Sequence, residues 1–172
     1  MFSRRPNKNE TRAALQPLYA SIVAIARAPH WYLEGAAPDT LDGRFDMVAA
    51  VLALVLMRLE QIGARGIGNA ALLTEIFIED MDAQLRQIGV GDLVVGKHIG
   101  RMVSALGGRL GAYRAALDDD AALRDALIRN LYRGDVPAEP ALNHMIQELR
   151  ALAHALAGQN EASLIRGDFT SM

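Results

Sequence analysis

Apolar positions recur at helical spacing along most of this chain, and no segment shows the strict alternation of a half-buried strand. We therefore predict an all-α fold, a single compact helical domain of about six helices. The predicted helices cover residues 11–28, 43–62, 69–87, 92–117, roughly 118–132, and 139–157.

The helix predicted over 43–62 has apolar residues on every side. Residues 47–57 read MVAAVLALVLM without a charge, between Asp46 and Arg58. A helix that is apolar all round is typical of the centre of a domain. Its eleven uncharged residues would span about 16 Å, half of a hydrocarbon core of about 30 Å. This run therefore predicts a buried central helix and not a membrane span.

Helix-breaking residues and charges set the expected boundaries. Pro29 should end the first helix and begin a loop over 29–41, and the glycines in GARGIG, residues 63–68, should form a break. The expected organisation is a disordered basic arm over 1–10, a helical domain over 11–157 and a flexible tail over 158–172.

Composition narrows the classes of function. The net charge of −2 and pI near 6.1 exclude a strongly basic nucleic-acid-binding domain. Without cysteine there is no disulfide framework and no thiolate chemistry. No apolar stretch promptly follows the basic pair Arg4-Arg5, which argues against a signal peptide. We expect a cytoplasmic protein that associates with the inner membrane, if at all, only at its periphery.

Candidate catalytic and cofactor motifs are weak. GDLVVGK, residues 91–97, matches the spacing of a phosphate-binding loop. However, a predicted helix and not a strand precedes it, and His98 stands where Ser or Thr would hold Mg²⁺. The four histidines lack partners at metal-ligand spacing, apart from His144 four residues before Glu148. We expect no catalytic residues, no cofactor, no metal and no enzyme activity.

Several phrases together resemble the ubiquinol–cytochrome c chaperone family. They are LYASIVAIARAPHWY, PDTLDGRFDM, EDMDAQLRQIGVGDLVVGKHIGRM and GRLGAYRAAL, which follow in order between about Leu18 and Leu117. The family is helical, and its mitochondrial members are assembly factors of the cytochrome bc1 complex that hold newly made cytochrome b. The lack of a long N-terminal extension resembles the bacterial members.

The resemblance implies a non-catalytic chaperone that binds an apolar client segment of cytochrome b or another bc1 subunit, with room for a second assembly factor. Methionine side chains adapt to varied apolar partners, and Met47, Met57, Met81 and Met102 are available for a helical groove. The basic arm would add weak attraction to an anionic membrane surface. No nucleic acid is expected as a partner.

The segment PDTLDGRFD, residues 38–46, carries more charge than a helix start requires. Thr40 or Asp42 would satisfy the need for a cap, and we assign Asp42 to this role. Phe45 is expected to pack the central helix against the first helix.

Arg44 and Asp46 are then expected to pair with charges of the turn over residues 92–97, with Asp92 capping the following helix. This would place the 39–46 and 89–97 segments side by side along one binding face. The predicted partner-binding set is Asp39, Thr40, Asp42, Arg44, Phe45, Asp46, Asp92, Lys97 and Arg109.

An alternative from another functional class is a soluble helical domain that binds a small anionic ligand. Lys97, Arg101 and Arg109 would supply its cationic groups, together with helix N-termini.

Overall fold

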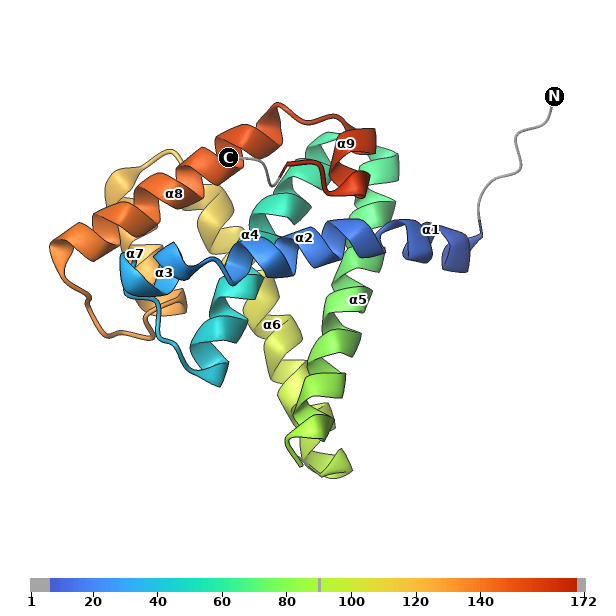
Figure 1. Ribbon diagram of the computed structural model, residues 1–172, viewed down its shortest axis with the longest axis horizontal. Coiled ribbons are helices and arrows are strands. Elements are labelled where there is room, and N and C mark those ends of the chain that lie inside the picture. Colours follow the sequence, from blue (N-terminus) through green and yellow to red (C-terminus); the bar gives the residue numbers. More distant parts are fainter. Residues whose placement is uncertain (1–6, 90, 170–172) are drawn as a thin grey trace.

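The computed structural model describes residues 7–89 and 91–169, with the backbone alone at 92 and 93. Helix is the only regular secondary structure within these residues, which confirms the all-α prediction (Figure 1). The helices are α1 (Lys8–Ala14), α2 (Gln16–Ala26), α3 (Pro29–Leu33), α4 (Leu41–Gln61), α5 (Ala64–Gln87), α6 (Asp92–Ala116), α7 (Asp120–Asn130), α8 (Glu139–Ala157) and α9 (Glu161–Arg166).

Helix α4 is the centre of the domain, as its uniformly apolar pattern predicts. It packs against α2, α5, α6 and α8. Its middle, from Asp46 to Leu56, is buried at every position. Figure 1 shows α2 and α8 crossing the body around it, while α5 and α6 project together beyond the body. No helix in the described part of the chain is both long and apolar enough to cross a bilayer.

Nine helices are present in the described residues where about six were predicted. The first predicted helix is divided at Leu15, because Pro17 cannot donate a backbone hydrogen bond and begins a new helix, α2. The predicted loop over 29–41 contains α3, with Pro29 at its first position. Short helices without a clear periodic stripe account for the difference.

The ends of the domain also extend beyond 11–157. Asn7 caps α1 through a reciprocal hydrogen-bond pair with Glu10, so residues 8–10 of the predicted basic arm are helical. Residues 1–6 lie outside the described residues. The prediction of a flexible tail is wrong at α9, because Leu164 is fully buried and Phe169 is 5% exposed.

The break over 63–68 is shorter than predicted. Only Gly63, with φ of 104°, adopts a conformation that favours glycine, and α5 begins directly after it. Gly66 lies inside α5, where a Cβ atom would come within 1.9 Å of the Leu59 carbonyl oxygen. The glycine at this position therefore permits a close approach between α5 and the end of α4.

Candidate functional site

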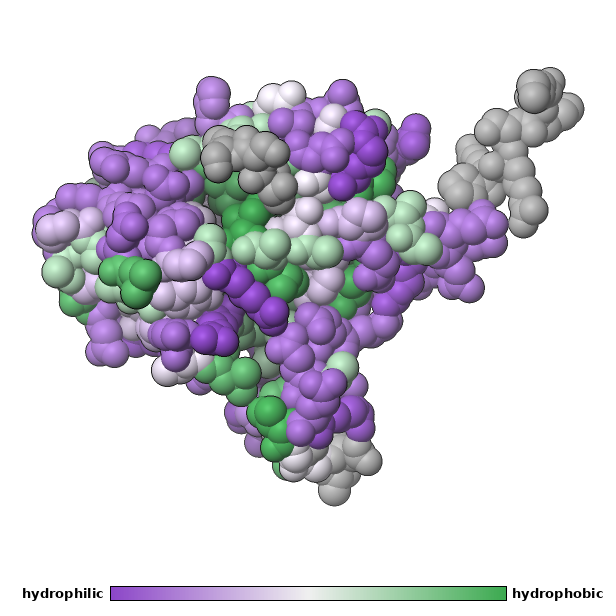
Figure 2. Space-filling view, in the orientation of Figure 1, coloured by the Kyte–Doolittle hydropathy of each residue, from purple (hydrophilic) through white to green (hydrophobic). Residues whose placement is uncertain are grey.

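An apolar groove of about 330 Å³ lies beside the start of α4, where α5 and α6 leave the body. Figure 2 shows hydrophobic side chains along the edge of the projecting pair and at its junction with the body. The apolar side chains that line the groove come from α2, α4, α5 and α6: Val23, Leu41, Phe45, Val48, Met81, Leu85, Ile88 and Met102. Leu41 and Ile88 are 54% and 58% exposed, so the groove has an apolar rim open to solvent.

Polar side chains on one wall of the groove are already engaged. Asp80 accepts hydrogen bonds from the Tyr19 hydroxyl at 2.7 Å and from the Gln84 amide at 3.0 Å. Burial, with the hydrogen bond to Asp80 next, raises the pKa of Tyr19, which keeps the phenol protonated as the donor. These two bonds fix the Asp80 carboxylate on the α5 side.

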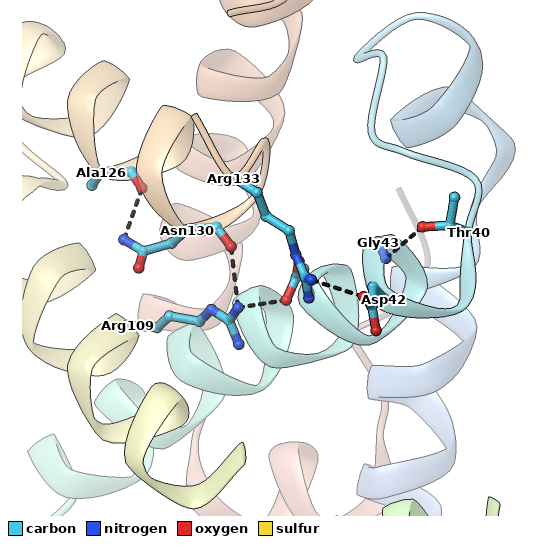
Figure 3. A network of polar contacts seen from close by, with 8 residues as sticks. Thr40, Asp42, Gly43, Arg109, Ala126, Asn130 and Arg133 are labelled. Atoms are coloured by element: carbon cyan, nitrogen blue, oxygen red, sulfur yellow. Dashed lines mark hydrogen bonds and ion pairs between the residues drawn. The ribbon is translucent and has the colours of Figure 1, made fainter. Parts of the chain in front are cut away.

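The start of α4 differs from the prediction in its capping residue. Thr40 is the N-cap, and its hydroxyl accepts a hydrogen bond from the Gly43 backbone N–H at 3.1 Å (Figure 3). Because α4 begins at Leu41, two residues earlier than predicted, Asp42 lies in the first turn. Its carboxylate pairs instead with Arg133 at 2.8 Å. Asp42 still complements the positive end of the helix dipole.

An ion cluster of Asp42, Asp46, Arg109 and Arg133 lies at the same end of α4, with Asp46 and Arg109 buried and Asp42 exposed (Figure 3). Asp46 is fully buried. One of its oxygens accepts from Arg109 Nη2 at 2.5 Å and the other from Arg133 Nε at 2.7 Å. The cluster therefore joins α4 to α6 and to the connection between α7 and α8.

The electrostatics of this cluster balance burial against pairing. Burial raises the pKa of the Asp46 carboxyl, while Arg133 and Arg109 act in the opposite direction. Arg109 also donates to the Asn130 carbonyl at 3.2 Å, and its guanidinium carbon lies 5.4 Å from the centre of the Phe45 ring. This cation–π contact links the cluster to a side chain of the groove.

The ion pairs predicted for the 39–46 segment differ from those in the structure. Arg44 pairs with Asp39, Nε to Oδ1 at 2.6 Å, and has no ion pair with the described side chains of the 92–97 turn. Asp46 pairs with Arg109 and Arg133, as described above. Phe45 packs against Phe77 of α5, with ring centres 5.6 Å apart, and lines the groove together with Val23 of α2. Arg44 therefore pairs within its own segment, whereas Asp46 pairs with α6 and the α7–α8 connection.

The groove is lined by residues of the 39–46 segment and by two residues that flank the 89–97 segment. Asp42, Arg44 and Phe45 line it from α4, and Ile88 and His98 line it from either side of the 89–97 turn. Whether these residues bind a partner is not decided by their position and stays a prediction.

The remaining predicted residues lie in different surroundings. Asp39 lines a recess next to the groove, which shares Arg27 and Arg44 with it. Lys97 is exposed on α6. Gly91 and not Asp92 is the N-cap of α6, and the Asp92 side chain lies outside the described residues.

The alternative anion site is not assembled as predicted. Arg109 is 7% exposed and paired with Asp46, whereas Lys97 and Arg101 are on the solvent-facing side of α6. The three cations therefore do not face one ligand. No three metal-ligating side chains come together in the described part of the chain.

Arg133 is the main functional-site residue that sequence reasoning missed. It has a positive φ of 54°, is half exposed, and bonds both Asp42 and Asp46. Its position directly before Gly134 indicates the end of a helix. Nothing in the local sequence indicates that it pairs with Asp46, 87 residues away.

Comparisons with known proteins agree with the resemblance seen in the sequence. A family model described as ubiquinol–cytochrome c chaperone matches residues 34–171. The crystal structure of the Cbp3 homolog from Brucella abortus is similar, with 30% sequence identity and a TM-score of 0.81. That similarity covers 96% of this chain and 92% of the other chain. Curated proteins gave no match.

Proposed function

This chain belongs to the ubiquinol–cytochrome c chaperone family, and on this premise we propose that it is a non-catalytic assembly factor that holds an apolar segment of cytochrome b. In this proposal the segment occupies the apolar groove until the client joins the bc1 complex. Another bc1 subunit with an apolar helix would meet the same chemical requirement.

The observation that carries the proposal is the groove itself. A transmembrane segment is unstable in water because its apolar faces need cover. The groove offers Met81 and Met102, whose flexible thioether side chains adapt to different apolar surfaces. Leu41 and Ile88 are exposed at its rim, and their burial against a client helix would contribute favourably to binding.

A rim substitution tests this role without disturbing the core. Ile88→Glu places a charge at the groove, where it should reduce capture of cytochrome b by about tenfold, since burying an unpaired carboxylate against an apolar helix is unfavourable. Ile67→Glu is the matched control, because Ile67 is 56% exposed on the same helix and outside the residues that line the groove. The measurement is recovery of cytochrome b with the tagged protein from detergent-solubilised cells, after chemical cross-linking.

Equal recovery by the two glutamate variants would contradict the role of the groove. Thermal melts of both proteins exclude misfolding as the cause of a loss. If the wild-type protein instead enriches a different bc1 subunit, and Ile88→Glu reduces that enrichment, the proposed role of the groove stands and the client is that subunit.

The setting of this function is part of the proposal. We place the protein in the cytoplasm, peripheral at the inner membrane, where it meets its client and a second assembly factor. Of the basic residues in the arm proposed to attract the membrane surface, Arg4 and Arg5 lie outside the described residues, and Lys8 pairs with Glu75 at 3.0 Å.

A further inference from the structure

Three cations at the margin of the groove have no acidic partner among the described residues. Arg27 lines the groove from the end of α2. Lys97 and Arg101 are exposed on α6, each directly before a residue that lines the groove, His98 and Met102. Most other arginines of the described residues bind a carboxylate, as Arg12 binds Glu79, Arg44 binds Asp39 and Arg114 binds Glu60.

The helix dipole does not explain Lys97 and Arg101. Both lie in the N-terminal half of α6, which begins at Asp92. A helix N-terminus carries partial positive charge, so cations gain nothing from the dipole there. Their separation of four residues places them on the same side of the helix, one turn apart.

The described acids near the groove already have partners. Asp42 is paired with Arg133, and Asp39 with Arg44. Asp80 accepts hydrogen bonds from Tyr19 of α2 and Gln84 of α5. The margin along α6 therefore presents positive charge to whatever enters the groove, within about 8–10 Å at physiological salt.

We propose that the client segment held in the groove is an apolar helix that carries two carboxylates, four residues apart, at the flank that meets α6. Lys97 and Arg101 would each pair with one of them, since groups four residues apart face the same side of both helices. The cations would fix the orientation of the client and select it, while the apolar contacts provide most of the affinity. This inference rests on the proposed function of the groove.

Labelled model peptides test the inference with the full-length protein. Three Leu/Ala-rich helices of about 18 residues, long enough to cover the groove, differ at one flank. They carry a pair of Glu, Gln or Lys residues four positions apart. Binding is followed by fluorescence anisotropy at low and moderate salt. The Glu peptide should bind the wild-type protein about fivefold more tightly than the Gln peptide, the size expected for two exposed ion pairs of up to about 0.5 kcal/mol each.

Charge reversal on the protein should reverse this preference. Lys97→Glu/Arg101→Glu should bind the Lys peptide more tightly than the Glu peptide. Arg129→Glu is the control, because Arg129 is an exposed cation on α7, lacks an acidic partner in the described part of the chain, and does not line the groove. It should retain the wild-type order of the three peptides.

Equal affinity of the Glu and Gln peptides for the wild-type protein would overturn the inference and leave the proposed groove intact, provided that Ile88→Glu weakens both. Vesicles of phosphatidylglycerol provide the second arm. One outcome is that the Lys97→Gln/Arg101→Gln protein no longer sediments with these vesicles, while the wild-type protein binds the Glu and Gln peptides equally. The cations then bind an anionic membrane surface, and the inference fails. Failure of every peptide to bind would instead contradict the proposed function.

Discussion

Asp46 is a carboxylate placed inside the most apolar helix of the chain. Two guanidinium groups, from Arg109 and Arg133, compensate for its loss of water. A buried ion pair of this kind gives little net stability against an apolar replacement, but removing one partner leaves a buried charge alone. The pair therefore matters most for fixing how α4, α6 and the α7–α8 connection fit together.

We expect Asp46→Ala to lower the free energy of unfolding by about 3–5 kcal/mol, since it leaves the buried Arg109 guanidinium without its carboxylate. Asp39→Ala is the control, because the Asp39–Arg44 pair is exposed to solvent and its loss should have a much smaller effect on stability. Urea melts of both variants measure the difference. Equal losses of stability in the two variants would mean that the buried pair contributes no more to folding than an exposed one.

His30 and His144 form a second polar contact, between α3 and α8. Their Nδ1 and Nε2 atoms are 3.0 Å apart, so one ring must be neutral to accept the proton of the other. Burial is the main cause that lowers the pKa of His30 below its ordinary value of 6.5, and His144 adds to this effect. The nearby carboxylates of Glu148 and Glu34 oppose it.

This shift predicts that stability falls in mild acid. Between the lowered pKa of His30 and its ordinary value of 6.5, the unfolded chain binds more protons than the folded one. The free energy of unfolding should therefore decrease as the pH falls below about 6.5. His30→Gln should weaken this pH dependence in urea melts, whereas His154→Gln, at an exposed position of α8, should not. A pH dependence unchanged by His30→Gln would rule out this origin.

The residues at the start of α4 were predictable as a group but not in their pairing. The density of charged residues in PDTLDGRFD indicates a special segment, and it does border the groove. Asp42 and Asp46 both pair with Arg133, which is distant in sequence and is brought to the start of α4 by the fold. Local pattern therefore identified the segment, while tertiary packing decides its contacts.

Among the helices, those with a long apolar stripe were predicted closely. Residues 139–157 form α8 as expected, and α4 differs by two residues at its start. Helix α9 was missed because six residues are too few for a periodic pattern, and its stability comes from burial of Leu164. Short helices that depend on tertiary contacts are the elements that sequence periodicity cannot identify.

Replacing glycine by alanine should have opposite effects on stability in different helices of this fold. At Gly100 of α6 no atom lies within 4 Å of where a Cβ would stand, so Gly100→Ala should stabilise the protein by about 0.4–1 kcal/mol through helix propensity and chain entropy. At Gly66 of α5 a Cβ would collide with the Leu59 carbonyl, so Gly66→Ala should destabilise it by about 1–3 kcal/mol. Thermal melts of the two variants should shift in opposite directions. A lower melting temperature for Gly100→Ala would indicate a close contact that the structure does not contain.

At the scale of the whole molecule, the C-terminal segment closes the core. Gly167 accepts a hydrogen bond from Ser21 of α2 at 3.2 Å, and the Gln159 carbonyl accepts two from Arg58 of α4. Leu164 and Phe169 add buried apolar surface against the same body. Residues 159–169 therefore belong to the folded domain.

Deletion from Asn160 onward should lower the free energy of unfolding by about 3–6 kcal/mol, because two apolar side chains lose their burial at about 1.5–3 kcal/mol each. Urea denaturation followed by circular dichroism measures this loss. Leu164→Ala offers a milder comparison, with an expected loss of about 2–5 kcal/mol. If the truncated protein is as stable as the full chain, the segment does not contribute to the core.

Under the proposed function, the glycines of α6 have a further consequence for how a client would leave the groove. Gly96, Gly100, Gly107 and Gly108 are exposed on a helix that forms one wall and projects from the body. Glycine has more backbone conformational freedom than other residues. A client that restricts the backbone of α6 would therefore incur an entropic penalty. That penalty limits the affinity and shortens the residence time of the complex. A wall of this composition thus favours reversible holding, in which the client departs for its final subunit contacts without an energy-consuming release step.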